Sequence, residues 1–220
     1  MPAPTRRDLL KWGVLIEGGL VLAALLVGRL AGVDPWQMTP SWPALLWGLG
    51  AILPILGGYA ISGDVRDLVV RLLGPALVEC RWYDLVILAG LAGLGEELLF
   101  RGTVELYLES WHLWGGMLAT NLIFGAAHAL NWQYFFFASA VGLYLSWLSG
   151  FPGAERNLLP AVIAHGVYDA IAFFLIRAEY FDVLEERKRQ AIAPDSGSSL
   201  QTTEVAAPSG TDDVKDIDQE

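Results

Sequence analysis

Repeated apolar segments of about 20 residues, separated by short polar loops, constrain this chain more than any other feature. Crossing the roughly 30 Å of hydrocarbon in a bilayer takes about 20 mostly apolar helical residues. Helices are the expected element, because the backbone finds no water to bond there. Hydropathy predicts six spans, at about residues 12–33, 43–61, 85–107, 113–130, 133–149 and 158–176. We therefore predict an all-α fold, a polytopic transmembrane bundle of about six spans.

The composition agrees with a membrane protein that ends in an acidic tail. Hydrophobic residues are 54% of the chain and the mean hydropathy is +0.44, above the range of ordinary soluble domains. Seven acidic residues and one lysine lie between residues 191 and 220, and they carry much of the net charge of −10. This balance argues against a nucleic-acid partner. We predict a basic cytoplasmic N-terminus (1–11), a transmembrane domain (12–186) and a disordered cytoplasmic tail (187–220).

Lysine and arginine gather in three places: the N-terminus, the polar loop at 62–84, and the segment after the sixth predicted span. With six spans these three places share one side, which the positive-inside rule assigns to the cytoplasm. We therefore predict a multi-pass protein of the cell membrane with both termini cytoplasmic. The middle of the polar loop, residues 68–78, predicts a short interfacial helix. Tryptophans near predicted span ends suggest an aromatic belt: Trp36, Trp42, Trp111, Trp114 and Trp132.

Three of the predicted spans contain short motifs of ionisable side chains, which are expensive at that depth. Such groups usually face the interior of the bundle and mark a functional site. Coming from three helices, they are expected to converge on one buried polar site. The three constellations are Glu96-Glu97-x-x-x-Arg101, Phe124-x-x-x-His128 and His165-x-x-x-Asp169.

The spacing of these residues predicts different tasks for them. Residues four apart share a helix face, so Arg101 is expected to neutralise Glu97. Glu96 points about 100° away, lacks a local cation and is free to act as a base. Asp169 shares a face with His165 and is expected to fix the tautomer of that imidazole.

A few other polar residues received simpler interpretations. Asn121 lies two turns before His128 on the same face and is expected to support the site. We interpret Glu17 as an interhelical or snorkelling group and His112 as a residue at a span end. The single Cys80 lies outside the polar cluster, and the chain has no Gly-x-Ser-x-Gly motif.

The three motifs resemble those of the CAAX prenyl protease and bacteriocin-processing intramembrane endopeptidases, the Abi or CPBP family. That pattern is Glu-Glu-x-x-x-Arg, Phe-x-x-x-His and His-x-x-x-Asn or Asp, and here it covers about residues 85–177. The resemblance implies that Glu96 and His128 activate a water, that His165 and Asp169 line the oxyanion side, and that Glu97 and Arg101 support them. Because a carboxylate accepts hydrogen bonds, Asp169 is expected to orient His165 instead of binding the oxyanion directly. The substrate would be a membrane-bound or lipidated protein or peptide, and the oligomeric state is not indicated.

Other interpretations of the same residues stay open at this point. Glu96, His128 and His165 suit a zinc site with an open position, although we expect no cofactor because Arg101 lies beside them. A non-catalytic bacteriocin-immunity or scaffold protein is a second alternative. A transporter with a carboxylate–histidine proton relay is a third. In a fourth, the polar groups only join the helices.

Overall fold

The computed structural model describes residues 5–150 and 155–192, and it is built from helices; no strand occurs among these residues. The predicted tail therefore lies outside the described residues from position 193 onward. The chain divides into two compact units, Met1–Leu184 and Glu185–Glu220, of which the first holds the candidate site. The elements are α1 (Arg6–Ala31), α2 (Trp42–Gly50), α3 (Ile52–Ile61), α4 (Gly63–Leu77), α5 (Trp82–Leu99), η1 (Phe100–Glu105), α6 (Leu106–Glu109), α7 (Leu113–Ala127), α8 (Trp132–Ser149) and α9 (Leu159–Ile192).

Within the described part of the chain, three segments are long and apolar enough to cross a membrane: Arg6–Ala31, Trp42–Ile61 and Leu159–Ala191. The second of them is interrupted at Ala51, where α2 gives way to α3. Helix α5 carries three carboxylates, Asp84, Glu96 and Glu97, and the last two belong to the candidate site. The all-α class is confirmed, whereas the count of six spans stays a prediction.

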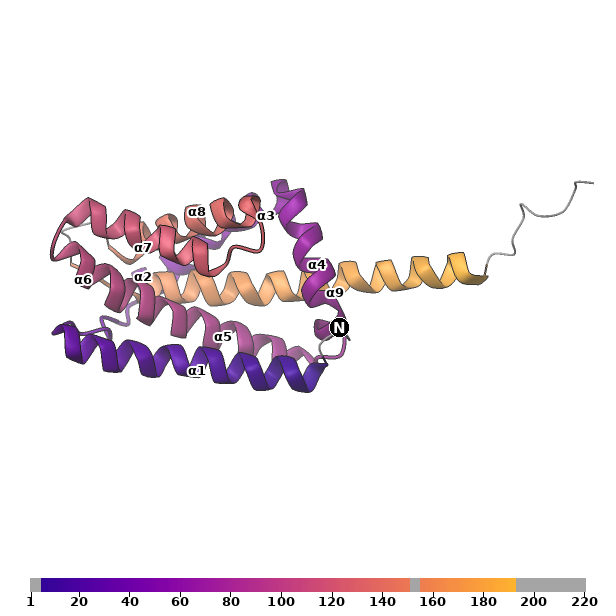
Figure 1. Ribbon diagram of the computed structural model, residues 1–220, viewed down its shortest axis with the longest axis horizontal. Coiled ribbons are helices and arrows are strands. Elements are labelled where there is room, and N and C mark those ends of the chain that lie inside the picture. The colour runs from indigo at the N-terminus through magenta and orange to yellow at the C-terminus, as the bar shows by residue number, and fades with distance from the viewer. Residues whose placement is uncertain (1–4, 151–154, 193–220) are drawn as a thin grey trace, which may run out of the picture. The chain divides into compact units, whose positions relative to one another are not determined.

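Helix α1 begins earlier than hydropathy predicts because its start is fixed by side chains. Thr5 and Asp8 form a capping box that satisfies free backbone N–H groups. Arg6 then binds Asp84 at the start of α5 through two contacts of 2.7 and 2.8 Å. The hydrogen bond from Arg6 holds the pKa of Asp84 below its usual range. The pair therefore ties the first turns of α1 and α5 together, and the two helices run side by side (Figure 1).

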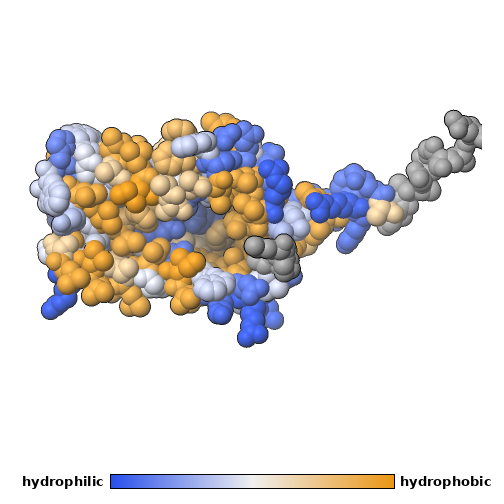
Figure 2. Space-filling model, in the orientation of Figure 1, coloured by the Kyte–Doolittle hydropathy of each residue, from blue (hydrophilic) through white to orange (hydrophobic). Residues whose placement is uncertain are grey.

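The outer surface of the bundle is apolar in its middle. Figure 2 shows hydrophobic residues across this part of the face, with hydrophilic residues toward the ends. Several large side chains are largely exposed, including Leu22 at 69%, Leu53 at 72% and Ile61 at 86%. Exposed apolar area on this scale is typical of a surface that meets lipid. All five tryptophans expected in an aromatic belt are exposed as well.

Helices α5 and α9 approach each other closely where both lack a side chain. A Cβ atom built on Gly93 would lie 2.6 Å from the backbone nitrogen of Gly166 and 2.8 Å from its Cα. No real Cβ fits at that distance, so the contact needs glycine on α5. Gly93 precedes Glu96 by three residues and Gly166 follows His165, and this contact therefore brings those two parts of the candidate site together.

This contact generates a stability prediction. Gly93→Ala should force α5 and α9 apart and cost about 1–3 kcal/mol, as overpacking does. The measurement is the thermal unfolding temperature in detergent. Gly90→Ala is the matched control, since a Cβ there meets nothing within 4 Å and alanine favours a helix. Equal unfolding temperatures for the two variants would contradict the predicted clash.

Candidate active site

The first part of the site is the end of α5, where the helix changes type. Glu96 and Glu97 occupy the last α-helical turn, and the backbone then continues as the π-helix η1, which contains Arg101. Four residues exceed one α-helical turn and fall short of one π-helical turn. The change therefore keeps Glu97, Arg101 and Glu105 close to one line along the helix. Turns of this type occur often at functional sites.

Glu97 and Arg101 form the ion pair that their spacing predicts. Arg101 Nη1 donates to Glu97 Oε1 at 3.0 Å, and neither side chain has any exposed surface. The guanidinium also donates through Nη2 to Asn121 Oδ1 at 3.0 Å. Its plane lies over the ring of Phe124, 4.3 Å from the ring centroid. Helix α7 thus supplies an amide acceptor and an aromatic face for one buried cation.

His165 on α9 reaches the same glutamate. Its Nδ1 lies 2.8 Å from Glu97 Oε1, and a carboxylate can only accept there. Its other nitrogen, Nε2, lies 3.6 Å from Asp169 Oδ2 and 3.9 Å from Glu96 Oε2, both longer than a hydrogen bond. The hydrogen-bonded carboxylate partner of His165 is therefore Glu97, whereas the spacing on α9 had suggested Asp169.

Glu96 faces the two histidines. Its Oε2 lies 3.6 Å from His128 Nε2, and the atom is buried with no hydrogen-bond partner among the described residues. His128 caps the C-terminal end of α7, and its Nδ1 contacts the carbonyl oxygen of Phe124 at 2.9 Å. A carbonyl can only accept, so Nδ1 carries a proton. In the neutral ring, the lone pair on Nε2 would face Glu96.

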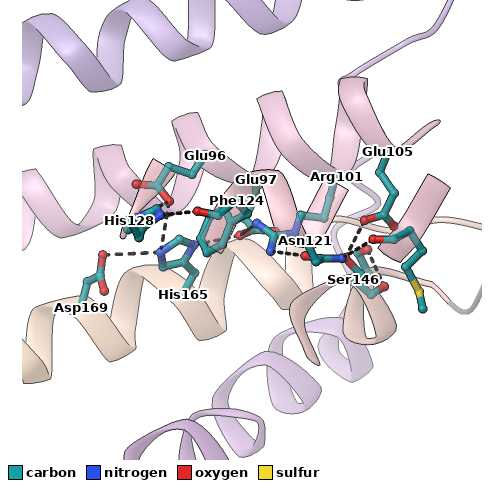
Figure 3. Close-up of polar contacts among 12 residues, drawn as sticks. Glu96, Glu97, Arg101, Glu105, Asn121, Phe124, His128, Ser146, His165 and Asp169 are labelled. Carbon is teal, nitrogen blue, oxygen red and sulfur yellow. Dashed lines mark hydrogen bonds and ion pairs between the residues drawn. The ribbon is translucent and has the colours of Figure 1, made fainter. Parts of the chain in front are cut away.

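The four residues expected to form the centre of the site thus lie together, as Figure 3 shows: Glu96, His128, His165 and Asp169. They line a cavity of about 220 Å³. The rest of its wall is largely apolar and aromatic, with Tyr59, Tyr134, Phe137 and Tyr168 from three helices. A polar corner in an apolar cavity is a common design for a small binding or reaction site.

Three further polar residues lie near the site: Glu17, which the sequence suggested only as an interhelical or snorkelling group, and Ser146 and Glu105, which were not singled out. Glu17 on α1 lines the same cavity, and its Oε2 is buried without a partner among the described residues. Asn121 Nδ2 donates to Ser146 Oγ of α8 at 2.8 Å, and Ser146 Oγ donates to Glu105 Oε2 at 2.5 Å. Glu105 continues the four-residue spacing of Glu97 and Arg101, and that was its only signal. A lone serine in an apolar helix gives none.

The residues suited to zinc, Glu96, His128 and His165, lie close together. The Nε2 atoms of His128 and His165 both face Glu96 Oε2, and the Glu97 contact to Nδ1 of His165 is the kind of support that metal-bound histidines receive. Within residues 5–150 and 155–192, however, no three His, Cys, Asp or Glu side chains group closely enough to hold a metal ion.

Comparison with known families places the three motifs in one context. The family model of type II CAAX prenyl endopeptidases, described as Rce1-like, matches residues 79–171. This stretch contains all three motifs, so the resemblance that they suggested is confirmed. No curated protein and no solved structure matches the chain. Together with the long apolar helices, the match indicates a membrane protein that is similar to a family of peptidases over these residues.

The buried ion pair generates a second prediction. Arg101→Ala should leave Glu97 without its cation and cost about 3–5 kcal/mol, the usual penalty for breaking a buried pair. Thermal unfolding in detergent measures the loss. The control is Arg189→Ala, which removes an arginine that is 75% exposed and pairs with Glu185 at 3.7 Å. An Arg101→Ala protein with the same unfolding temperature as Arg189→Ala would show that the ion pair is not needed for stability.

Proposed function

We propose that this protein is an intramembrane endopeptidase that hydrolyses a peptide bond in a membrane-associated or lipidated protein or peptide. One observation carries the proposal: an unpartnered glutamate oxygen, Glu96 Oε2, faces the Nε2 atoms of two histidines in a largely apolar cavity. The match to a family of prenyl endopeptidases over the same residues supports it.

In the proposed reaction a water molecule is held between Glu96 and His128. Both Glu96 Oε2 and the lone pair on His128 Nε2 accept hydrogen bonds, so a water can donate one proton to each. The 3.6 Å between these atoms is too long for a direct contact and is a separation at which bridging water is expected. Glu96 takes a proton from the water as the oxygen attacks the peptide carbonyl carbon.

The attack forms a carbon–oxygen bond and places negative charge on the former carbonyl oxygen. His165 is the proposed donor to that oxygen. In this role it carries both ring protons. Its Nδ1–H donates a hydrogen bond to Glu97, and its Nε2–H donates one to the oxyanion. The carbon–nitrogen bond then breaks as protonated Glu96 returns its proton to the leaving amine. Asp169 lies on the Nε2 side of His165 and helps to set the direction of the ring.

The membrane arrangement of the proposed enzyme follows the sequence. Six spans with both termini cytoplasmic keep the basic segments on one side. On the face drawn in Figure 2 the apolar surface is hollowed, and polar residues lie within the hollow. This supports a substrate that arrives with its lipid or its apolar helix in the bilayer. A prenylated tail, a leader peptide and a membrane-anchored regulator all suit such a cavity.

The decisive prediction concerns Glu96. Glu96→Gln keeps the shape but removes the base, so cleavage should fall by at least about a hundredfold, with insertion and unfolding temperature unchanged. The assay incubates vesicles holding the purified protein with libraries of lipidated and unmodified peptides, and mass spectrometry detects the products. Glu179→Gln is the control, because that carboxylate pairs only loosely with Arg66, at 3.6 Å.

Cleavage by Glu96→Gln at the rate of the wild-type protein would remove Glu96 from the mechanism. A wild-type protein that cleaves no peptide but retains a protein partner would favour the alternative of a non-catalytic immunity or scaffold protein.

A further prediction separates water activated by glutamate from water activated by zinc. We propose that no metal takes part, so activity should survive exhaustive chelation and the purified protein should contain well under one zinc per chain. A zinc enzyme would instead lose activity with its metal and regain it on return, because the metal lowers the pKa of its bound water to about 7. Elemental analysis and activity assays on the same samples distinguish the two. Activity that is lost with the zinc and regained on its return would leave the peptidase assignment in place. Glu96, His128 and His165 would then be the zinc ligands.

A further inference from the structure

We propose that a buried polar relay behind the site, formed by Asn121, Ser146, Glu105 and Arg156, positions Arg101 and thereby His165. This inference rests on the proposed function, because it assigns the relay to the same reaction. Its members are positioning residues: none of them lines the cavity that holds Glu96 and His165. The relay comes from η1, α7, α8 and the short segment that precedes α9.

The relay is continuous in hydrogen bonds except at Glu105 and Arg156, which form an ion pair, and Figure 3 shows its inner part. Each contact is within ordinary bonding distance. The contacts are Arg101 Nη2 to Asn121 Oδ1 at 3.0 Å, Asn121 Nδ2 to Ser146 Oγ at 2.8 Å, Ser146 Oγ to Glu105 Oε2 at 2.5 Å, Glu105 Oε1 to Arg156 Nη1 at 2.9 Å and Arg156 Nη2 to Glu109 Oε2 at 2.7 Å.

The chemistry of these groups gives the relay one direction. The ionised carboxylate of Glu105, paired with Arg156, can only accept, so the single hydroxyl hydrogen of Ser146 is donated to this carboxylate. Ser146 must then accept from Asn121, which turns the amide nitrogen toward Ser146. The amide oxygen is left to face Arg101. Glu105 thus supports the orientation of the Asn121 amide, together with the Met117 carbonyl, which accepts from the same amide nitrogen at 2.8 Å.

Packing closes the remaining side of Arg101. A Cβ atom on Gly142 of α8 would lie 2.5 Å from Asn121 Oδ1 and 2.9 Å from Arg101 Nη2. Phe124 covers one face of the guanidinium at 4.3 Å. The cation has no exposed surface and no room to turn. Its position is therefore fixed by α7 and α8 as well as by Glu97.

That position reaches the reaction through one shared atom. Glu97 Oε1 accepts from Arg101 Nη1 at 3.0 Å and from His165 Nδ1 at 2.8 Å. A shift of Arg101 moves this oxygen, and the imidazole follows it. Arg101 alone would be enough to neutralise Glu97. The proposed task of the relay is to hold Arg101, and through Glu97 the ring of His165, in one orientation.

The test uses two variants that perturb the relay at different points, Ser146→Ala and Gly142→Ala. Each has a control with the same chemical change at a position outside the relay. Ser149→Ala removes a buried hydroxyl of α8 that donates to the Ser146 carbonyl and not to the relay. Gly90→Ala adds a Cβ that meets nothing within 4 Å. Glu105→Gln, which nearly preserves shape, serves as the relay variant if Ser146→Ala or Gly142→Ala does not fold.

Two readouts are taken on each protein in detergent. Both relay variants should lower kcat roughly ten- to a hundredfold with KM little changed, since small displacements in a site carry penalties of that size. The chain has three histidines, so ring-labelled ¹⁵N spectra contain three sets of signals, assignable by replacing His112 and His128. The signals of His165 should shift in the relay variants and those of His112 should stay, and the two controls should match the wild-type protein in both readouts.

The outcomes separate this inference from the proposed function. Wild-type kcat and unmoved His165 signals in the relay variants would overturn the relay while cleavage that depends on Glu96 stands. A loss of kcat that only follows the folded fraction, with His165 unmoved, would also overturn it. If the wild-type protein cleaves nothing, the proposed function fails, and the His165 spectra still decide whether the relay positions that ring.

Discussion

Burying charge in an apolar bundle is costly, and the structure around the candidate site is arranged to offset that cost. The free energy of removing a single ion from water is several kcal/mol even after relaxation. Here Glu97 and Arg101 neutralise each other at 3.0 Å with no exposed surface. The remaining donors of Arg101 and the carboxylate of Glu105 then need partners of their own, and α7 and α8 carry Asn121 and Ser146 where those partners are needed.

Glu96 stands apart from this compensation. It lies next to Glu97 in the chain but faces the cavity, and its Oε2 has no partner among the described residues. A carboxylate that faces the cavity without a hydrogen-bonded cation, beside one that pairs with Arg101, is a reasonable location for chemistry, because perturbed and unpaired ionisable groups gather at functional sites. The same helix turn thus contains one carboxylate that holds the structure and one that is available to a substrate.

The sequence predicted those features that depend on local spacing. A spacing of four residues on a helix places Glu97 beside Arg101. The cost of burying ionisable groups at membrane depth predicts that the three motifs lie together. The contact of Glu97 with His165 joins residues 68 apart and depends on how closely α5 and α9 approach, which the glycine contact sets. Ser146 was not foreseen because a hydroxyl in an apolar helix usually bonds its own backbone. The carboxylate that it meets comes from another helix.

The π-helix η1 has a consequence for how this chain is compared with others. A π turn closes its hydrogen bond over five residues where an α turn uses four, so η1 contains one residue more than an unbroken α-helix of the same rise. Where a related helix lacks this turn, a residue-by-residue alignment has to place a gap between Phe100 and Glu105. Glu96 and Glu97 precede the gap, so their alignment is the same with or without it, whereas every position after the gap changes register. Residues aligned with Glu105 and Glu109 by sequence alone then point about 100° away from those that occupy the same place in space.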